Sequence, residues 1–207
     1  MKIMKSNEIL QLLEENKKEV KNFADVLNLS NNLDRHLNVG SIDDETGDIV
    51  EDIIRFWNKV DDDAGIPIEK RQPIKIYINS EGGSLLATFT IMDAIRLSKT
   101  PVYTINVGIA YSGGFFTFIC GHKRFTYPHS SFLFHEGNMT LGNMDANKFR
   151  NAADFYDKQL DLIEKVVLEK TKISQESYDK HRKDDWWILA NEALELGICD
   201  EIVDKFI

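Results

Sequence analysis

The sequence has no excess of basic residues. Its 25 lysine and arginine residues stand against 34 aspartate and glutamate residues, and the formal net charge is −9 at pH 7. A field of this sign repels nucleic acid and anionic membrane surfaces, and no basic cluster opposes it. We therefore expect neither a nucleic-acid partner nor a membrane partner.

Cysteine is scarce as well. The only two cysteines, Cys120 and Cys199, lie far apart in the sequence. Their spacing argues against a disulfide framework and a zinc site, and no other set of histidine, cysteine, aspartate and glutamate has metal-ligand spacing. We expect both thiols to be small buried groups in a reducing cytoplasm, and we expect no metal and no other cofactor.

An uninterrupted apolar run is missing from the N-terminus, where charged residues are scattered through MKIMKSNEILQLLEENKKEVKNF. The pattern argues against a signal peptide and a membrane span, so the expected location is the cytoplasm. Proline is also rare, with four residues, and no stretch has low complexity. With 43% hydrophobic residues, the 207-residue chain is typical of a globular protein with a sizeable core.

The first part of the chain is expected to form an appendage. Apolar residues spaced among glutamate and lysine over residues 6–21 predict an amphipathic helix that packs or docks. The polar stretch at residues 28–38 is the expected hinge. We therefore divide the chain into an N-terminal helical appendage, residues 1–38, and a main domain, residues 39–207.

Strand and helix patterns alternate in the main domain. Residues 73–80 and 101–110 are rich in β-formers, and residues 84–98 between them have helical spacing. Consecutive βαβ units imply an α/β fold with a mostly parallel sheet and right-handed crossovers. Further predicted elements are a helix at 47–60, strands at 124–128 and 131–135, a helix at 190–196 closed by Gly197, and a strand at 198–203.

A long helix is predicted over residues 145–170. Its apolar residues recur every three or four positions and form one stripe: Phe149, Ala152, Ala153, Tyr156, Leu160, Ile163 and Val167. A stripe of this length exceeds what one small domain readily covers, so it predicts an interface between subunits. A charge at Leu160 is expected to weaken such an assembly.

Two glycine-rich turns are candidates for chemistry. The segment NSEGGS at residues 79–84 ends a predicted strand and opens a helix, so its N–H groups could bind an oxyanion; alternatively it is an ordinary turn with Ser84 as helix cap. Ser112 follows the next strand and precedes Gly113, which allows a nucleophile or another N-cap. Ala110 breaks the G-x-S-x-G pattern, which argues against an α/β-hydrolase.

His135 is the third candidate. It ends the apolar strand SFLF, from which it could reach a neighbouring loop, although a structural histidine is an equally open interpretation. The remaining histidines lie in polar contexts without such a strand: His36, His122, His129 and His181. Cys120 falls inside an apolar run, where a thiolate would be poorly solvated, so it is a weak candidate for a nucleophile.

Taken together, these features resemble one family over residues 39–203. The matching segments are YINSEGG at 77–83, AYSGGF at 110–115, GHKRF at 121–125, PHSS at 128–131, FHE at 134–136, DWWI at 185–188, EA at 192–193 and ELGICD at 195–200. The chain is identified as a member of the Clp protease proteolytic subunits (ClpP), peptidase family S14. The resemblance implies a ClpP/crotonase-type α/β fold of repeated β-β-α or βαβ units, with a protruding long "handle" helix.

Site roles follow from the resemblance. It makes Ser112 the nucleophile, His135 the general base and Asp185 the acid that orients the histidine, while the N–H groups of Gly83 and Gly113 form the oxyanion hole. Serine needs a base to take its proton, and the imidazole needs its other nitrogen held in the correct tautomer. The implied activity is a serine endopeptidase that cleaves peptides or unfolded polypeptides inside an oligomeric chamber.

The implied partners are further copies of the chain, in a ring or stacked rings, and an AAA+ unfoldase. Four places depart from the family pattern: Glu81 for proline, Gly113 for methionine, Glu136-Gly137 for Gln-Pro and Lys183-Asp184 for Asp-Arg. The segment before Val39 has no match to the family's axial loop. Alternatives are a phage-type head-maturation (prohead) protease of the same family, an enoyl-CoA hydratase-like enzyme and an inactive structural subunit.

Overall fold

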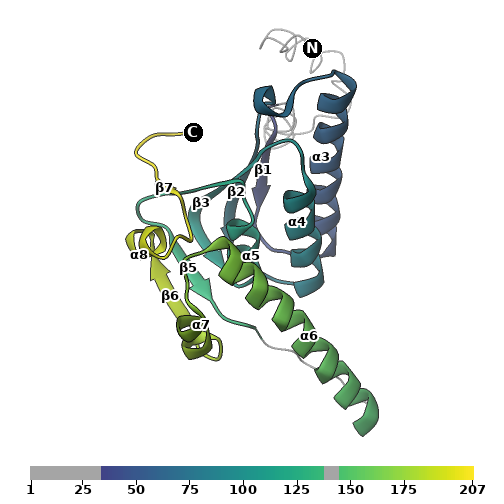
Figure 1. The fold of residues 1–207 in the computed structure, drawn as a ribbon, viewed down its shortest axis with the longest axis vertical. Coiled ribbons are helices and arrows are strands. Elements are labelled where there is room, and N and C mark those ends of the chain that lie inside the picture. Colours follow the sequence, from purple (N-terminus) through teal and green to yellow (C-terminus); the bar gives the residue numbers. More distant parts are fainter. Residues whose placement is uncertain (1–33, 138–144) are drawn as a thin grey trace, which may run out of the picture.

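A seven-stranded sheet lies at the centre of the computed structural model, which describes residues 34–137 and 145–207 (Figure 1). The main path of the sheet runs β1-β2-β3-β4-β7, while β5 pairs with β3 and with β6. The pairing of β5 with β6 is antiparallel, and the others are parallel. The strands are β1 (His36–Val39), β2 (Ile74–Ser80), β3 (Val102–Tyr111), β4 (Lys123–Thr126), β5 (Ser131–Phe134), β6 (Trp186–Leu189) and β7 (Glu201–Ile202).

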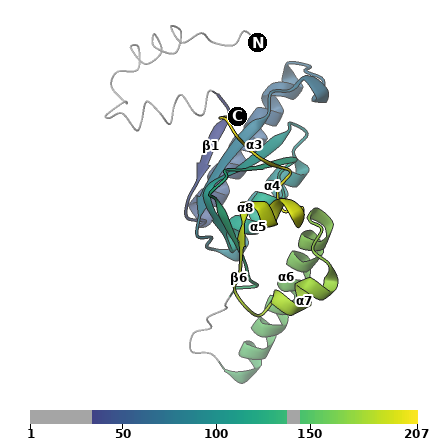
Figure 2. The same ribbon diagram turned by 90° about the vertical axis from the view of Figure 1, so that its left-hand side faces the viewer.

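The helices connect these strands. They are α3 (Asp44–Asp63), a short 3₁₀ helix (Ile68–Lys70), α4 (Leu85–Leu97), α5 (Gly113–Ile119), α6 (Ala146–Lys170), α7 (Gln175–His181) and α8 (Ala190–Glu195). Figure 2 shows α4 and α5 on one side of the sheet. The predicted strand-helix-strand order with a mostly parallel sheet is confirmed, because β2, α4 and β3 form a βαβ unit with β2 and β3 paired in parallel.

The core forms where β-branched residues of the central strands meet the helices. Ile74, Ile76 and Ile78 of β2 alternate with more exposed residues and are fully buried. On the same sheet, β3 is ten residues long and pairs with three other strands. Every residue of α5 is buried, which agrees with its sequence GGFFTFI, in which Thr117 is the one polar side chain.

The predicted boundaries differ from the structure at the N-terminal side. The helix expected at 47–60 extends over Asp44–Asp63, because the Asp43 side chain caps it by accepting a hydrogen bond from the Thr46 N–H. The boundary expected between residues 38 and 39 falls inside β1, which pairs with β2. The helix predicted at 6–21 lies outside the described residues.

The long helix α6 is confirmed within one residue of its predicted start, and Asp145 is its N-cap. Figure 1 shows that it runs away from the body of the molecule. Its two halves differ: Leu160 and Ile163 in the C-terminal half are buried, whereas Phe149 in the N-terminal half is 52% exposed. A charge at Leu160 would therefore disturb the fold of the chain itself, and Phe149 is the better position for a test of assembly.

The two cysteines are free and buried, as predicted. Burial raises the pKa of the Cys120 thiol to about 12 and that of the Cys199 thiol to about 11. A thiol with such a pKa is protonated at neutral pH, so Cys120 is unsuited to nucleophilic attack. Within residues 34–137 and 145–207, no helix has the length and apolar character needed to cross a membrane.

Candidate active site

The site residues lie where three parallel strands end. Ser80 at the end of β2 pairs with Ala110 of β3, and Tyr111 at the end of β3 pairs with Leu133 of β5. The carboxyl ends of parallel strands meet at one edge of a sheet, and open α/β folds place their chemistry there. The glycine turn, Ser112 and His135 each follow directly after one of these strands.

Ser112 has an unusual backbone conformation. Its φ of 52° and ψ of −119° are strained for a residue with a side chain, and the cost is of order 1–3 kcal/mol. The residue stands at the N-cap position of α5, yet its side chain makes no capping hydrogen bond, whereas the Ser84 side chain caps α4. Capping therefore does not explain the serine at this position.

The turn after β2 is pressed against Ser112. Gly82 has a φ of +96°, and a Cβ atom there would lie 2.8 Å from the Gly113 nitrogen and 2.9 Å from the Ser112 Cβ. Gly83 has a φ of +151°, and a Cβ atom would collide with the Ile42 carbonyl oxygen. Glycine is therefore required at Gly82 by the close approach of the Ser112 turn and at Gly83 by the backbone of Ile42.

Two N–H groups remain available at this contact. Ile42 donates to the Gly82 carbonyl at 3.0 Å and accepts from the Ser84 N–H at 2.7 Å, so the intervening Gly83 N–H faces away from Ile42. The Gly113 N–H belongs to the first turn of α5, where helical N–H groups have no intrahelical partner. The Gly83 nitrogen lies 3.5 Å from the position that a Gly113 Cβ would occupy.

His135 and Asp185 come together through β5 and β6. These antiparallel strands pair Phe134 with Trp186, so the residue after β5 lies opposite the residue before β6. His135 Nδ1 is 3.3 Å from Asp185 Oδ1, and the two side chains are 24% and 57% exposed. At the same edge, the Ser112 N–H donates to the Leu133 carbonyl at 3.0 Å, which ties the serine to the strand that ends before His135.

Two of the other described histidines, His122 and His181, have contacts that suit a structural role. His122 Nδ1 accepts a hydrogen bond from the Val102 N–H at 2.9 Å, and burial together with the charge of Lys170 lowers the pKa of this imidazole. His181 stacks on Trp186 with ring centroids 4.1 Å apart. Neither residue contacts a carboxylate in the way His135 contacts Asp185.

The family assignment follows from comparison with known proteins. The family model described as Clp protease matches residues 67–206, a span that contains all five predicted site residues. The chain belongs to the Clp protease family. Members are serine peptidases, which confirms the predicted enzyme class, a serine-type endopeptidase that hydrolyses peptide bonds.

Individual Clp relatives agree with this assignment. The ATP-dependent Clp protease proteolytic subunit 1 of Chlamydia muridarum is 33% identical over 139 residues, which cover 65% of this chain and 72% of the relative. The proteolytic subunit 2 of Treponema pallidum is 29% identical and is covered to 68%. A mutant ClpP1 from Listeria monocytogenes has a similar structure, with a TM-score of 0.71 and 25% identity over 86% of this chain and 96% of that one.

Sequence reasoning did not identify Glu136 as a functional candidate in this member of the Clp family. Glu136 stood out only as a departure from the family pattern, but its carboxylate contacts Tyr178 and Arg182. Tyr178 is 42 residues away in the sequence. No local pattern signals such a contact, because it depends on where α7 packs.

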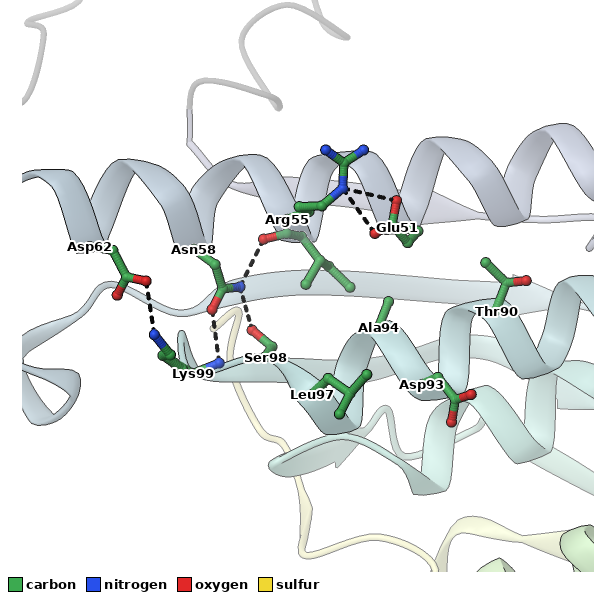
Figure 3. A pocket seen from close by; sticks show the side chains of 11 residues that line it. Glu51, Arg55, Asn58, Asp62, Thr90, Asp93, Ala94, Leu97, Ser98 and Lys99 are labelled. Carbon is green, nitrogen blue, oxygen red and sulfur yellow. Dashed lines mark hydrogen bonds and ion pairs between the residues drawn. The ribbon is translucent and has the colours of Figure 1, made fainter.

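A cavity of about 430 Å³ lies away from these strand ends, between α3 and α4. Figure 3 shows that Asn58 crosses one side of it, donating to the Ile54 carbonyl and to Ser98 while accepting from the Lys99 N–H. None of the five predicted site residues lines this cavity. We therefore place the chemistry at the strand ends.

Proposed function

We propose that this chain is a serine endopeptidase in which Ser112, His135 and Asp185 form the catalytic triad. The observation that carries the proposal is the setting of Ser112. This strained, non-capping serine is hydrogen-bonded to the strand that leads to His135, and the imidazole of His135 lies 3.3 Å from the Asp185 carboxylate. The proposed substrates are peptides and unfolded polypeptides.

Each residue has a definite step in the reaction. The Ser112 hydroxyl attacks the peptide carbonyl while His135 Nε2 takes its proton, and Asp185 accepts the hydrogen bond from Nδ1–H and stabilises the imidazolium. The protonated imidazole then gives the proton to the leaving amine, and an acyl-enzyme remains. Water repeats the sequence and releases the second product.

The N–H groups of Gly83 and Gly113 are proposed to form the oxyanion hole. The approach of Gly82 to Gly113 brings the two turns together beside Ser112, which supports this assignment. Two donors aimed at the developing negative charge contribute on the order of 3 kcal/mol each to lowering the barrier.

Assembly belongs to the proposal. The half of α6 that carries Phe149 and Phe155, 52% and 59% exposed, supports a homo-oligomer whose ring or stacked rings enclose the active sites. The relatives named ATP-dependent Clp proteases support an AAA+ unfoldase as partner. The free, buried cysteines support a cytoplasmic site of action, and the residues before β1 are proposed as an appendage to the peptidase domain.

Labelling with a fluorophosphonate probe tests the nucleophile. We expect the purified chain to be labelled at Ser112 and the Ser112→Ala variant to lose both labelling and peptidase activity. Ser84→Ala is the matched control, because this serine lies at the same sheet edge but caps α4. Labelling that persists in Ser112→Ala, or disappears in Ser84→Ala, would overturn the assignment.

Light scattering tests the assembly. The wild-type chain should have a mass several times 23.8 kDa. Phe149→Glu places a charge on the exposed half of α6, so it should lower the mass and leave the fold of the subunit intact. A fully active monomer would contradict the chamber and favour a peptidase that acts alone.

A further inference from the structure

The residue after His135 is held by an unusual set of contacts. The Glu136 side chain is only 11% exposed. Its Oε1 atom accepts a hydrogen bond from the Tyr178 hydroxyl at 3.0 Å and lies 2.8 Å from Arg182 Nε. The Nε–H bond of Arg182 is not directed at this oxygen, so the second contact is an ion pair rather than a hydrogen bond.

Arg182 lies three residues before Asp185, at the end of α7. Its carbonyl oxygen accepts the Glu136 N–H at 3.4 Å, which adds a backbone contact to the ion pair between the same two residues. Its Nη1 atom is 3.6 Å from a carboxylate oxygen of Glu164 on α6. One residue pair thus connects the segment that carries His135 with the segment that carries Asp185.

Contacts on both sides of His135 limit its movement. On one side, the Phe134 ring packs on Tyr178 with centroids 5.2 Å apart. On the other side, the Tyr156 hydroxyl of α6 donates to the Glu136 carbonyl at 2.9 Å. The contact between the His135 and Asp185 side chains is itself long, at 3.3 Å, and partly exposed. It is therefore too weak to fix the relative position of the two side chains.

We propose that the Glu136–Arg182 ion pair is a positioning device that keeps His135 aligned with Asp185. The proposal rests on the proposed catalytic triad and adds two residues to it that do not touch the substrate. Triad chemistry is sensitive to alignment, since a misplacement of about 1 Å can cost about a hundredfold in rate. The Glu136–Arg182 pair lies outside the triad and aligns His135 with Asp185 by holding together the two backbone segments that carry them.

Glu136→Gln is the central variant. The amide oxygen still accepts from Tyr178, while the negative charge nearest to Arg182 is gone. The ion pairs of Arg182 with Glu164 and Asp179 remain. Arg182→Met removes the other partner, and Arg182→Lys restores the positive charge. The control is Arg96→Met, which breaks the ion pair between Arg96 and Glu169 at 3.0 Å. That pair also joins α6 to the body but contacts neither Glu136 nor Arg182.

The measurements are kcat and KM for a short peptide, the rate of fluorophosphonate labelling at Ser112, and the folded fraction by circular dichroism. We expect Glu136→Gln and Arg182→Met to lower kcat and the labelling rate by between about tenfold and a hundredfold per folded molecule. KM should change by less than about threefold, since no substrate contact is lost. Arg182→Lys should recover a large part of kcat, and Arg96→Met should leave kcat unchanged.

Several results would overturn the proposal. Retention of kcat within about twofold in both Glu136→Gln and Arg182→Met would exclude a positioning role. Loss of activity only in proportion to the folded fraction, or an equal loss in Arg96→Met, would make the pair purely structural. Failure of the triad itself is separate, because it would show in the wild-type protein as absence of labelling at Ser112.

Discussion

Two carboxylates with a cationic or imidazole partner, Asp61 and Asp185, differ in how completely their hydrogen-bonding capacity is satisfied. Asp61 has a side chain with no exposed surface, and it accepts hydrogen bonds from Arg35 at 2.7 and 2.8 Å and from Thr100 at 2.8 Å. Asp185 is 57% exposed, and among the described residues its side chain has one partner, His135, at 3.3 Å. The Asp61 carboxylate is fully hydrogen-bonded, whereas the Asp185 carboxylate can still accept further or shorter hydrogen bonds.

The difference separates a structural pair, Asp61 and Arg35, from the pair that we propose as catalytic, Asp185 and His135. A buried charge is tolerated only when hydrogen bonds replace the lost water, which fixes Asp61 and its partners in one arrangement. A residue that stabilises a transient imidazolium gains from a contact that tightens as charge develops. The structural pair should therefore control stability, and the catalytic pair should control turnover.

The largest effect is expected for Asp185→Asn. The amide group of asparagine can donate to Nδ1, which favours the imidazole tautomer that cannot act as base at Ser112, so kcat should fall by about 10⁴-fold. The free energy of unfolding should change by less than about 0.5 kcal/mol, because the side chain is largely exposed. Steady-state kinetics and urea unfolding measure the two quantities. Unchanged turnover in this variant would remove Asp185 from the triad.

Asp61→Asn should show the reverse pattern. Removing the charge leaves the Arg35 guanidinium buried without its counter-charge, which costs about 3–5 kcal/mol of unfolding free energy. Turnover per folded molecule should stay within about twofold of wild type, since Asp61 lies away from the strand ends. Urea unfolding and active-site labelling separate the two effects. A loss of turnover per folded molecule as large as that in Asp185→Asn would contradict the distinction between the structural and the proposed catalytic carboxylate.

Acid titration gives a smaller, graded effect. Burial alone would raise the pKa of the Asp61 carboxyl, but hydrogen bonds from Arg35 and Thr100 and the charge of Arg35 outweigh it and lower this pKa. The associated stability is fully present above the ordinary aspartate pKa of about 4 and is lost as pH falls through the lower folded value. Unfolding free energy measured from pH 6 to pH 2 should fall less steeply in Asp61→Asn. Parallel curves would show that Asp61 does not contribute.

The smallest effects on the free energy of unfolding concern two serines, Ser84 and Ser112, that repeat the contrast. The Ser84 hydroxyl accepts the Ala87 N–H at 3.3 Å, so Ser84→Ala should cost about 1 kcal/mol of unfolding free energy. Ser112 caps nothing, so Ser112→Ala should leave stability within about 0.5 kcal/mol of wild type while activity disappears. Thermal unfolding of both variants checks this. A large stability loss in Ser112→Ala would mean that its hydroxyl is structural.

The sequence pattern predicted the strand-helix-strand order of the fold, and the resemblance to the Clp protease family supplied the proposed site residues. The apolar alternation in β2 and the stripe of α6 are local patterns with fixed periods, so their elements were found within a few residues. The sequence also predicted that Ser112 follows a strand at the carboxyl edge of the sheet, which the structure confirms. The pairings of β2 and β5 with β3 then place the glycine turn and His135 at the same edge.

Tertiary structure alone decided the rest. Sequence spacing could not show that the antiparallel pairing of β5 and β6 brings Asp185 to His135, or that Arg182 returns to Glu136, because these contacts join segments more than 40 residues apart. It could not show which half of α6 the body covers, nor that Ser112 adopts a positive φ without capping α5. Periodicity reports which residues share a face, whereas packing between distant elements determines what that face meets.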